Sequence, residues 1–157
     1  MSQLTFPTLE SLQSVVGGHA FTSDWVLIDQ KRIDQFAEAT SDPQWIHIDT
    51  ERAAKESPFG CTIAHGFLTL SLLGKFYDEK LSLPFCQMGL NYGLNKVRFI
   101  SPVKVNSRVR GQFLLSALEL IEGGLQMIFT VTIEVENQEK PACVAESIVR
   151  QYFTSKA

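Results

Sequence analysis

The chain has 157 residues, of which 45% are hydrophobic and 20% are charged, and its formal net charge is −3. This length predicts a single domain over residues 1–157, and the hydrophobic content is typical of a globular protein rather than a disordered chain. With 14 basic residues against 17 acidic ones, and no basic cluster, nucleic acid is not an expected partner.

Three cysteines, Cys61, Cys86 and Cys143, are widely spaced and form no Cys-x-x-Cys motif. They predict neither a disulfide framework nor a structural zinc site, and free thiols are typical of the reducing cytoplasm. The N-terminal residues lack the pattern of a signal peptide, and the longest apolar block, FLTLSLL, is far shorter than the ~20 residues that cross a bilayer. We therefore expect a cytoplasmic protein with no membrane partner.

The first half of the chain carries helix signals. FPTLESLQSVVGG predicts a short helix that Thr8 caps and that Gly17-Gly18 ends. SDWVLID alternates as a strand, and QKRIDQFAEATSD then has apolar residues at i, i+3, i+4 and i+7, which predicts an amphipathic helix capped by Asp29. DTERAAKES predicts another short helix, with Asp49 or Thr50 as its cap.

HGFLTLSLLGKFYDEKL predicts a longer helix that is apolar on nearly all sides in its first three turns. Such a helix must be surrounded by other structure. A helix of fifteen residues reaches about 22 Å, which is close to the width of a small domain.

Four strand-like runs follow this helix: MGLNYGLNKVRFI, KVNSRVRGQFLLSALEL, LQMIFTVTIEVEN and ACVAESIVRQYF. In the third run two sets of residues alternate, which predicts one face turned inward and one outward: Met127, Phe129, Val131, Ile133 and Val135 against Ile128, Thr130, Thr132 and Glu134. Gly123-Gly124 and NQEKP separate the last three as hairpin-type turns, and Pro102 predicts a bend. We expect an antiparallel meander that curls around the central helix, which is an α+β architecture. Pairing two sheets edge to edge across a two-fold axis would cover the free edges, so we expect a homodimer.

The stretch TSDPQWIHIDTERAA holds an acid, Asp42, five residues before an imidazole, His47. On spacing alone, a turn residue followed by a partly buried histidine explains the pair. Trp45 and Ile46 make the segment more apolar than a surface turn, and burial with mutual charge tunes such groups for proton transfer. A structural turn and a catalytic acid–base pair are therefore both open interpretations.

His65-Gly66 opens the central helix, whose first N–H groups lack internal partners and carry partial positive charge. Gly66 has no side chain, so its N–H is a candidate oxyanion donor, and tight packing at the helix entry is the alternative. For His65 a structural role is favoured over a catalytic one. Asp42, His47, Asp49 and His65 match no zinc spacing, so no metal site is predicted.

FAEATSDPQWIHIDTERAA, followed by SPFGCTIAHGFLTLSLL and NYGLNKVRFISPVKVNSRVR, resembles the MaoC-like (R)-specific enoyl-CoA hydratase family over about residue 10 to residue 153. It is similar above all to the short single-domain hydratases that supply polyhydroxyalkanoate synthesis and to nodulation protein N-like relatives. The resemblance implies a hot-dog fold, an antiparallel sheet wrapped around a long central helix. It also implies hydration of trans-2-enoyl-CoA to (R)-3-hydroxyacyl-CoA, with an acyl-CoA thioester as the partner and no cofactor.

Carried onto this chain, the resemblance makes Asp42 and His47 catalytic, and Gly66 becomes the glycine whose N–H binds the thioester oxygen. Asp42 would accept a proton from water, while His47 would orient that water and help to protonate C2. Gln44 and Trp45 stand where the family has Asn-Pro, which alters the loop between the two catalytic groups.

The acyl chain is expected in an apolar tunnel, with four candidate lining residues: Trp45, Phe59, Leu68 and Phe99. Gly74 stands where some family members carry a serine on the central helix, so no serine is carried over. Two alternatives stay open. One is a hot-dog thioesterase, which would release a CoA thiol, and the other is a non-catalytic module that binds acyl thioesters, which the altered loop favours.

Overall fold

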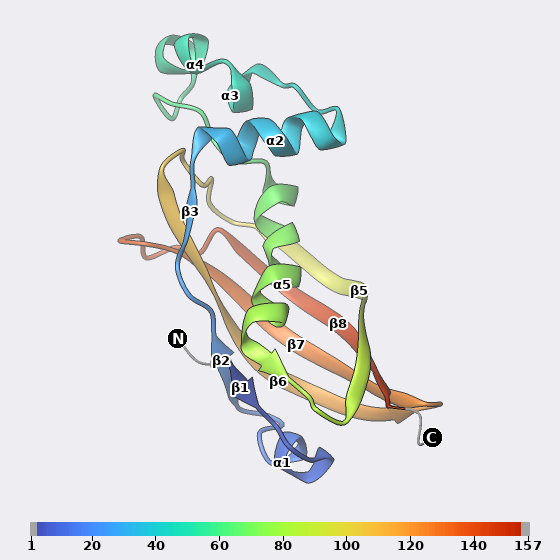
Figure 1. The fold of residues 1–157 in the computed structure, drawn as a ribbon. Coiled ribbons are helices and arrows are strands. Elements are labelled where there is room, and N and C mark those ends of the chain that lie inside the picture. The colour runs from blue at the N-terminus through green and yellow to red at the C-terminus, as the bar shows by residue number, and fades with distance from the viewer. Residues whose placement is uncertain (1–2, 155–157) are drawn as a thin grey trace.

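The computed structural model of the chain describes residues 3–154, and Figure 1 shows one long helix, α5 (Gly66–Lys80), along the inside of a curved sheet. The six strands of this sheet are β2 (His19–Thr22), β3 (Val26–Ile28), β5 (Cys86–Phe99), β6 (Ser107–Ile121), β7 (Gly124–Val135) and β8 (Cys143–Phe153). All pairs in it are antiparallel. The predicted α+β architecture, a sheet around a central helix, is therefore confirmed.

The strand order corrects part of the predicted meander. The order is β2-β6-β7-β8-β5, with β3 also paired to β6, so only β6, β7 and β8 form a meander. The first long strand, β5, pairs with β8 instead of with its successor β6. The connection after β5 contains Pro102 and runs across the end of the sheet, where Ile63 and Lys104 form an isolated bridge. A seven-residue extended segment can span about 23 Å, enough to pass the intervening strands.

The core lies between α5 and the sheet. Along β7, alternate residues are buried as the pattern predicted: Met127, Phe129, Val131, Ile133 and Val135. From the helix, Phe76 is fully buried, and its ring meets Phe113 of β6 edge to face at 6.2 Å between centroids. Aromatic rings and aliphatic side chains therefore fill the curve of the sheet and hold the helix there by burial of apolar surface.

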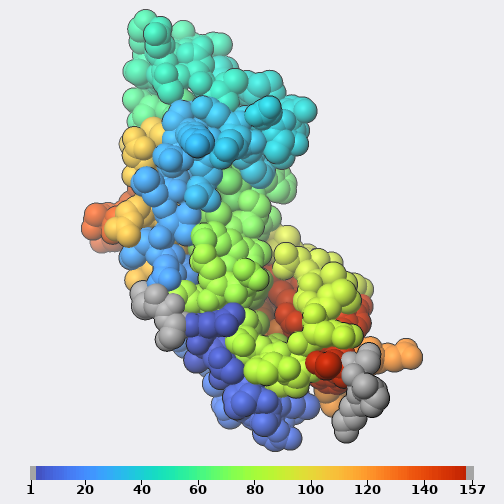
Figure 2. Space-filling model, viewed as in Figure 1, coloured from blue at the N-terminus to red at the C-terminus, as the bar shows by residue number. Residues whose placement is uncertain are grey.

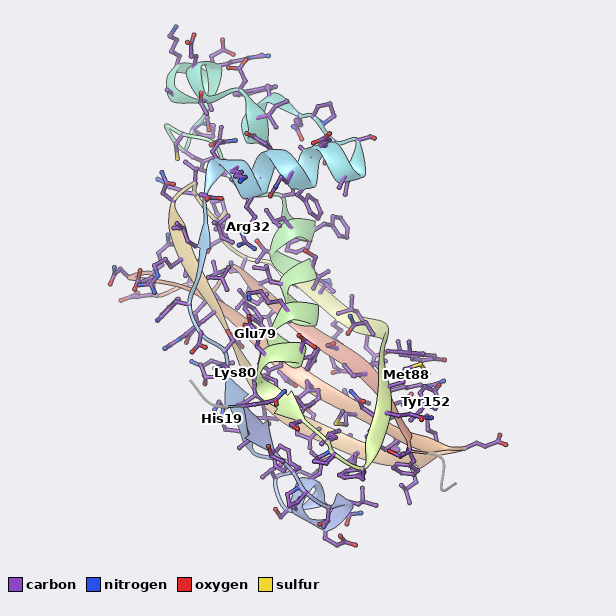
Figure 3. All side chains as sticks on the ribbon, in the orientation of Figure 1. His19, Arg32, Glu79, Lys80, Met88 and Tyr152 are labelled. Atoms are coloured by element: carbon purple, nitrogen blue, oxygen red, sulfur yellow. The ribbon has the colours of Figure 1, made fainter. Side chains whose placement is uncertain are left out.

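Other structure covers α5 less completely than its composition predicted. Phe67, in the first turn of α5, is 70% exposed. At the other end of α5, the buried Lys80 ammonium pairs with the Asp24 carboxylate at 2.8 Å, and this hydrogen bond lowers the pKa of Asp24. Figure 3 shows Lys80 at the foot of the helix, beside Glu79.

Three helices form a unit over the N-terminal end of α5, which we call the helical cap: α2 (Gln30–Thr40), α3 (Trp45–Ile48) and α4 (Thr50–Glu56) (Figure 1). Asp29 and Asp49 are confirmed as the N-terminal capping residues of α2 and α4. Their carboxylates accept hydrogen bonds from the backbone N–H groups of Arg32 and Arg52, each at 2.9 Å. The helical cap positions the candidate site described below.

Smaller elements complete the chain. Thr8 caps α1 (Leu9–Gln13), as predicted, and β1 (Leu4–Thr5) pairs in parallel with β4 (Leu81–Ser82). The expected turn at Gly123 is present, with φ of +72°, between β6 and β7. Within residues 3–154, no helix has the length and hydropathy needed to cross a bilayer.

Candidate active site

Asp42 lies where α2 ends and the chain turns toward α3. The preceding residue, Ser41, has the left-handed backbone conformation that ends many helices, with φ of +55°. The Asp42 N–H donates to the carbonyl of Ala37 at 3.0 Å, which closes the helix end. The Asp42 side chain is 56% exposed, so its carboxylate is accessible from outside the protein.

His47 lies in α3 and is almost completely buried, with 7% of its surface exposed. Its Nδ1 lies 2.7 Å from the carbonyl oxygen of Ile63, which makes Nδ1 the donor. The Gln30 side chain donates to the His47 carbonyl at 2.8 Å and accepts from the Thr62 hydroxyl at 2.5 Å. These bonds hold the His47 backbone and anchor Nδ1, and they leave Nε2 as the nitrogen available for chemistry.

Burial lowers the pKa of His47 below its ordinary value, and charge on the neighbouring His65 would lower it further. The hydrogen bond to the Ile63 carbonyl and the Asp42 carboxylate act in the opposite direction. Because burial is the largest effect, the neutral imidazole is favoured in the folded protein. In the neutral tautomer set by Ile63, Nε2 carries a lone pair and accepts hydrogen bonds.

His65 completes the group. It immediately precedes α5 and is 3% exposed, and its ring stacks on the His47 ring with 3.7 Å between centroids and an interplanar angle of 25°. Its Nε2 donates to the backbone carbonyl of Asp42 at 3.1 Å. The structure thus brings Asp42, His47 and His65 together, with a carboxylate oxygen and one nitrogen of each ring all within 4.8 Å of one another.

This group offers one ligand atom from each of three residues, one fewer than a structural zinc site, and one nitrogen of each ring already donates to a backbone carbonyl. Asp49, which the sequence also suggested for such a cluster, is not part of this group and caps α4 instead. The arrangement is better suited to proton transfer between an exposed carboxylate and a buried imidazole.

Gly66 is the first residue of α5, and Phe99 of β5 packs directly on it. A Cβ at this position would lie 3.0 Å from two atoms of the Phe99 ring, closer than side chains normally approach. Phe67 meets the same ring edge to face at 5.7 Å between centroids. The structure therefore gives a packing reason for this glycine. Its N–H has no hydrogen-bond acceptor among residues 3–154, as expected at the start of a helix.

The other predicted lining residues are dispersed. The Trp45 ring stacks under the Arg52 guanidinium at 4.3 Å, Phe59 lies half-buried in the loop after α4, and Leu68 belongs to the hydrophobic core. A groove of about 220 Å³ runs instead between α5 and β5, with β8 as its floor, and Figure 2 shows β8 atoms in the hollow between the two. Its lining residues are Leu70, Ser71, Leu73, Gly74, Asn91, Gly93, Leu94 and Ser147.

Sequence reasoning missed the residues that hold His47 in place. Gln30 and the Ile63 carbonyl act from segments 17 and 16 residues away, and no periodic pattern marks such contacts. The groove residues Ser71 and Gly74 carried a weak signal, because they are the small residues of an otherwise large-residue helix face.

A curved antiparallel sheet closed around one long helix defines the hot-dog class of proteins. Within this class, the sequence model described as "MaoC like domain" matches residues 11–138, and the chain belongs to that family. This confirms the family resemblance of the sequence.

The 3-hydroxyacyl-thioester dehydratase Z of Mycobacterium tuberculosis is 50% identical over 147 residues, which cover 93% of this chain and 97% of that protein. Nodulation protein N of Rhizobium meliloti is 46% identical over 158 residues, which cover 95% of this chain and 94% of that protein. The crystallised R-hydratase PhaJ1 of Pseudomonas aeruginosa superposes with a TM-score of 0.69 at 22% identity, over 88% of this chain and 83% of that one. The last similarity confirms the hot-dog fold.

Proposed function

We propose that this protein catalyses the reversible hydration of trans-2-enoyl-CoA to (R)-3-hydroxyacyl-CoA. The observation that carries the proposal is the approach of the Asp42 carboxylate to the His47 ring, within 4.8 Å, in front of the N-terminus of α5. Membership of the MaoC-like family supports a hydratase or dehydratase, and the name of the relative that is 50% identical supports an acyl thioester as the substrate.

The spacing of the two groups suits a bound water molecule. Two hydrogen bonds of about 2.8 Å that diverge from one water at its bond angle reach atoms roughly 4.5 Å apart. Because the Nδ1–H of His47 is committed to Ile63, its Nε2 would accept one hydrogen from this water. The Asp42 carboxylate would accept the other, so the water oxygen is directed at the substrate.

In the proposed reaction, Asp42 takes a proton from the water as its oxygen bonds to C3 of the enoyl group. The C2–C3 π electrons move toward the thioester carbonyl and form an enolate. The enolate then collapses, and C2 takes the proton that Asp42 holds. The neutral form of His47 favours the water-orienting part of its expected role over proton donation. Delivery of both groups from one side fixes the stereochemistry of the product.

The enolate oxygen would be stabilised at the start of α5, by the Gly66 N–H and the partial positive charge of the helix end. A single oxyanion donor of this kind contributes about 3–4 kcal/mol in other enzymes. The acyl chain would then follow α5 into the groove that Gly74 opens beside Asn91.

We further propose that two copies pair through β5. Among the strands of residues 3–154 this strand bonds only to β8, so its other edge is free of a partner strand there. Five of its large hydrophobic residues are between 42% and 55% exposed: Met88, Leu90, Tyr92, Leu94 and Phe99. Figure 3 shows Met88 on this outer strand beside Tyr152 of β8. A second copy would cover both the free edge and the apolar surface. Sedimentation at micromolar concentration tests this, and a monomer there would contradict it.

The proposed reaction is tested with purified protein and two substrates, crotonyl-CoA and trans-2-octenoyl-CoA. Loss of enoyl absorbance without release of thiol, with an (R)-3-hydroxyacyl-CoA product, is the expected result. Release of free CoA detected by a thiol reagent would instead identify a thioesterase. Thermal stabilisation by these ligands without turnover would identify a binding module, and either result would contradict the proposal.

A further inference from the structure

We propose that His65 is a positioning residue of this site, which holds Asp42 and His47 in their relative orientation without itself exchanging protons. The inference rests on the proposed function of Asp42 and His47. The evidence for this role is two side-chain contacts of His65, which is only 3% exposed, and its position in the chain.

The first contact is to the main chain of Asp42. The Nε2–H of His65 donates to the Asp42 carbonyl at 3.1 Å, whereas the carboxylate oxygen Oδ2 lies at 3.9 Å, beyond hydrogen-bond distance. Within residues 3–154 no other group donates to this carbonyl. His65 therefore ties the turn after α2 to the start of α5, and it leaves the carboxylate free to act.

The second contact is to His47, and it restrains a motion that other contacts leave open. The hydrogen bond from Nδ1 to Ile63 fixes one edge of the His47 ring, but a single bond does not fix the tilt of the ring around it. The His65 ring covers the His47 face at 3.7 Å, and Phe36 packs against His65 with 5.0 Å between centroids. Together these rings set the direction of His47 Nε2.

The third observation is the position of His65 in the chain. His65 directly precedes Gly66, and its side chain makes no capping hydrogen bond to α5. One residue thus joins the carboxylate-bearing turn, the imidazole and the helix start. A role as a helix cap does not explain its position, since the ring points away from the helix N–H groups and toward Asp42.

The Nδ1 nitrogen of His65 indicates that this residue does more than fill space. Nδ1 is buried and has no hydrogen-bond partner within the described chain. Because Nε2 carries the hydrogen, Nδ1 has a bare lone pair in the neutral ring, and such a buried acceptor is unfavourable. A leucine would fill the same space without this cost, but it would have neither the donor for Asp42 nor the flat face for His47.

Three variants separate the contacts: His65→Gln keeps a nitrogen donor at a similar reach, His65→Phe keeps a stacking ring, and His65→Leu keeps only volume. We expect kcat of the Leu variant, which keeps neither contact, to fall about 10- to 100-fold, because a displacement of reacting groups by about 1 Å has effects of this size. The Gln and Phe variants each keep one contact, so their kcat should fall less. KM for crotonyl-CoA should change less than about threefold in all three variants, since the acyl groove is untouched. Wild-type kcat in the folded Leu variant would overturn the inference, as would Gln and Phe variants that are no better than Leu.

A measurement on the wild-type protein covers the case in which variants do not fold. Nitrogen NMR of histidine-labelled protein should find a hydrogen on Nε2 of His65, bonded to the Asp42 carbonyl, and the Nδ1–H tautomer would overturn the inference. The variants Asp42→Asn and His47→Gln, assayed in parallel, distinguish a failure of the proposed function from a failure of the positioning role of His65. If both of these retain activity, the proposed function fails. If both lose it while the His65 variants are fully active, only the positioning role fails.

Discussion

The core under α5 and the helical cap over its N-terminus are held together by different forces. Between helix and sheet, rings of Phe76, Phe113 and Phe129 are fully buried and touch one another without a polar partner. In the helical cap, hydrogen bonds between side chains and backbone carbonyls dominate, and they centre on His47 and Gln30. Apolar burial tolerates small displacements, whereas directed hydrogen bonds specify the orientation of individual groups. The comparison indicates that the core supplies most of the stability and that the cap supplies the geometry for chemistry.

The largest expected effect on stability comes from the core. Phe113 stacks on Phe21 at 4.3 Å and meets three further rings. Phe113→Ala should lower the free energy of unfolding by about 3–5 kcal/mol, the usual cost of removing a buried aromatic ring. Chemical denaturation measures this, with Phe113→Leu as a milder control. The molecules that remain folded should keep their kcat, and a variant with full stability would contradict the core's assigned role.

A substitution in the helical cap should lower stability less than one in the core, and it should also lower kcat. Gln30→Leu removes the donor to the His47 carbonyl and the acceptor for the Thr62 hydroxyl. We expect a loss of about 1–3 kcal/mol in stability, because a buried partner is left unpaired. We also expect kcat to fall about tenfold or more as the His47 segment shifts. Gln35→Leu, the same substitution at an exposed glutamine of α2, is the matched control. Unchanged kcat for a folded Gln30→Leu protein would contradict the claim that the helical cap sets the geometry of the site.

The groove between α5 and β5 should control the length of the acyl chain. A Cβ at Gly74 would meet only the Asn91 amide, at 3.5 Å, so Gly74→Ala fits and is the control. Gly74→Leu would fill the groove, and kcat/KM for octenoyl-CoA should fall about tenfold or more, while crotonyl-CoA should react as before. An equal fall for both substrates would show that the acyl chain lies elsewhere.

The smallest expected effect concerns the pH dependence of stability that arises from buried His47. Burial lowers the pKa of His47 below its ordinary 6.5, so the unfolded chain binds a proton that the folded protein does not. The resulting stability is fully present above this ordinary value and is lost as the pH falls through the folded pKa. Between about pH 7 and about pH 5, wild-type stability should therefore fall more steeply than that of His47→Gln. Parallel unfolding curves at each pH test this, and identical slopes would contradict it.

Local signals in the sequence predicted much of the fold. Asp29 and Asp49 cap the helices that they were expected to cap, and β7 buries the expected alternate residues, because such features depend on neighbours within a few positions. The pairing of β5 with β8 was not predicted, since it depends on where a seven-residue connection crosses the sheet. The exposure of Phe67 was missed for a related reason, because composition does not reveal which side of a helix lacks a neighbour.

The sequence suggested the residues of the candidate site, but it did not suggest the residues that hold them in place. The spacing of Asp42 and His47, with Gly66 at a helix start, suggested three groups that the structure brings to one end of α5. None of the four expected lining residues borders the groove between α5 and β5: Trp45, Phe59, Leu68 and Phe99. Gln30 and Ile63 were missed because their hydrogen bonds join segments that only the folded chain brings together.

The central claim is that Asp42, as the group that takes and returns the proton, and His47, as the group that orients the water, act together on an enoyl thioester. Its most direct test is the hydration rate of crotonyl-CoA by Asp42→Asn and His47→Gln, with folding of each variant checked by circular dichroism and thermal unfolding. We expect kcat of each folded variant to fall about 10²- to 10⁴-fold, the usual contribution of a positioned acid or base. Wild-type rates in both folded variants would contradict the claim.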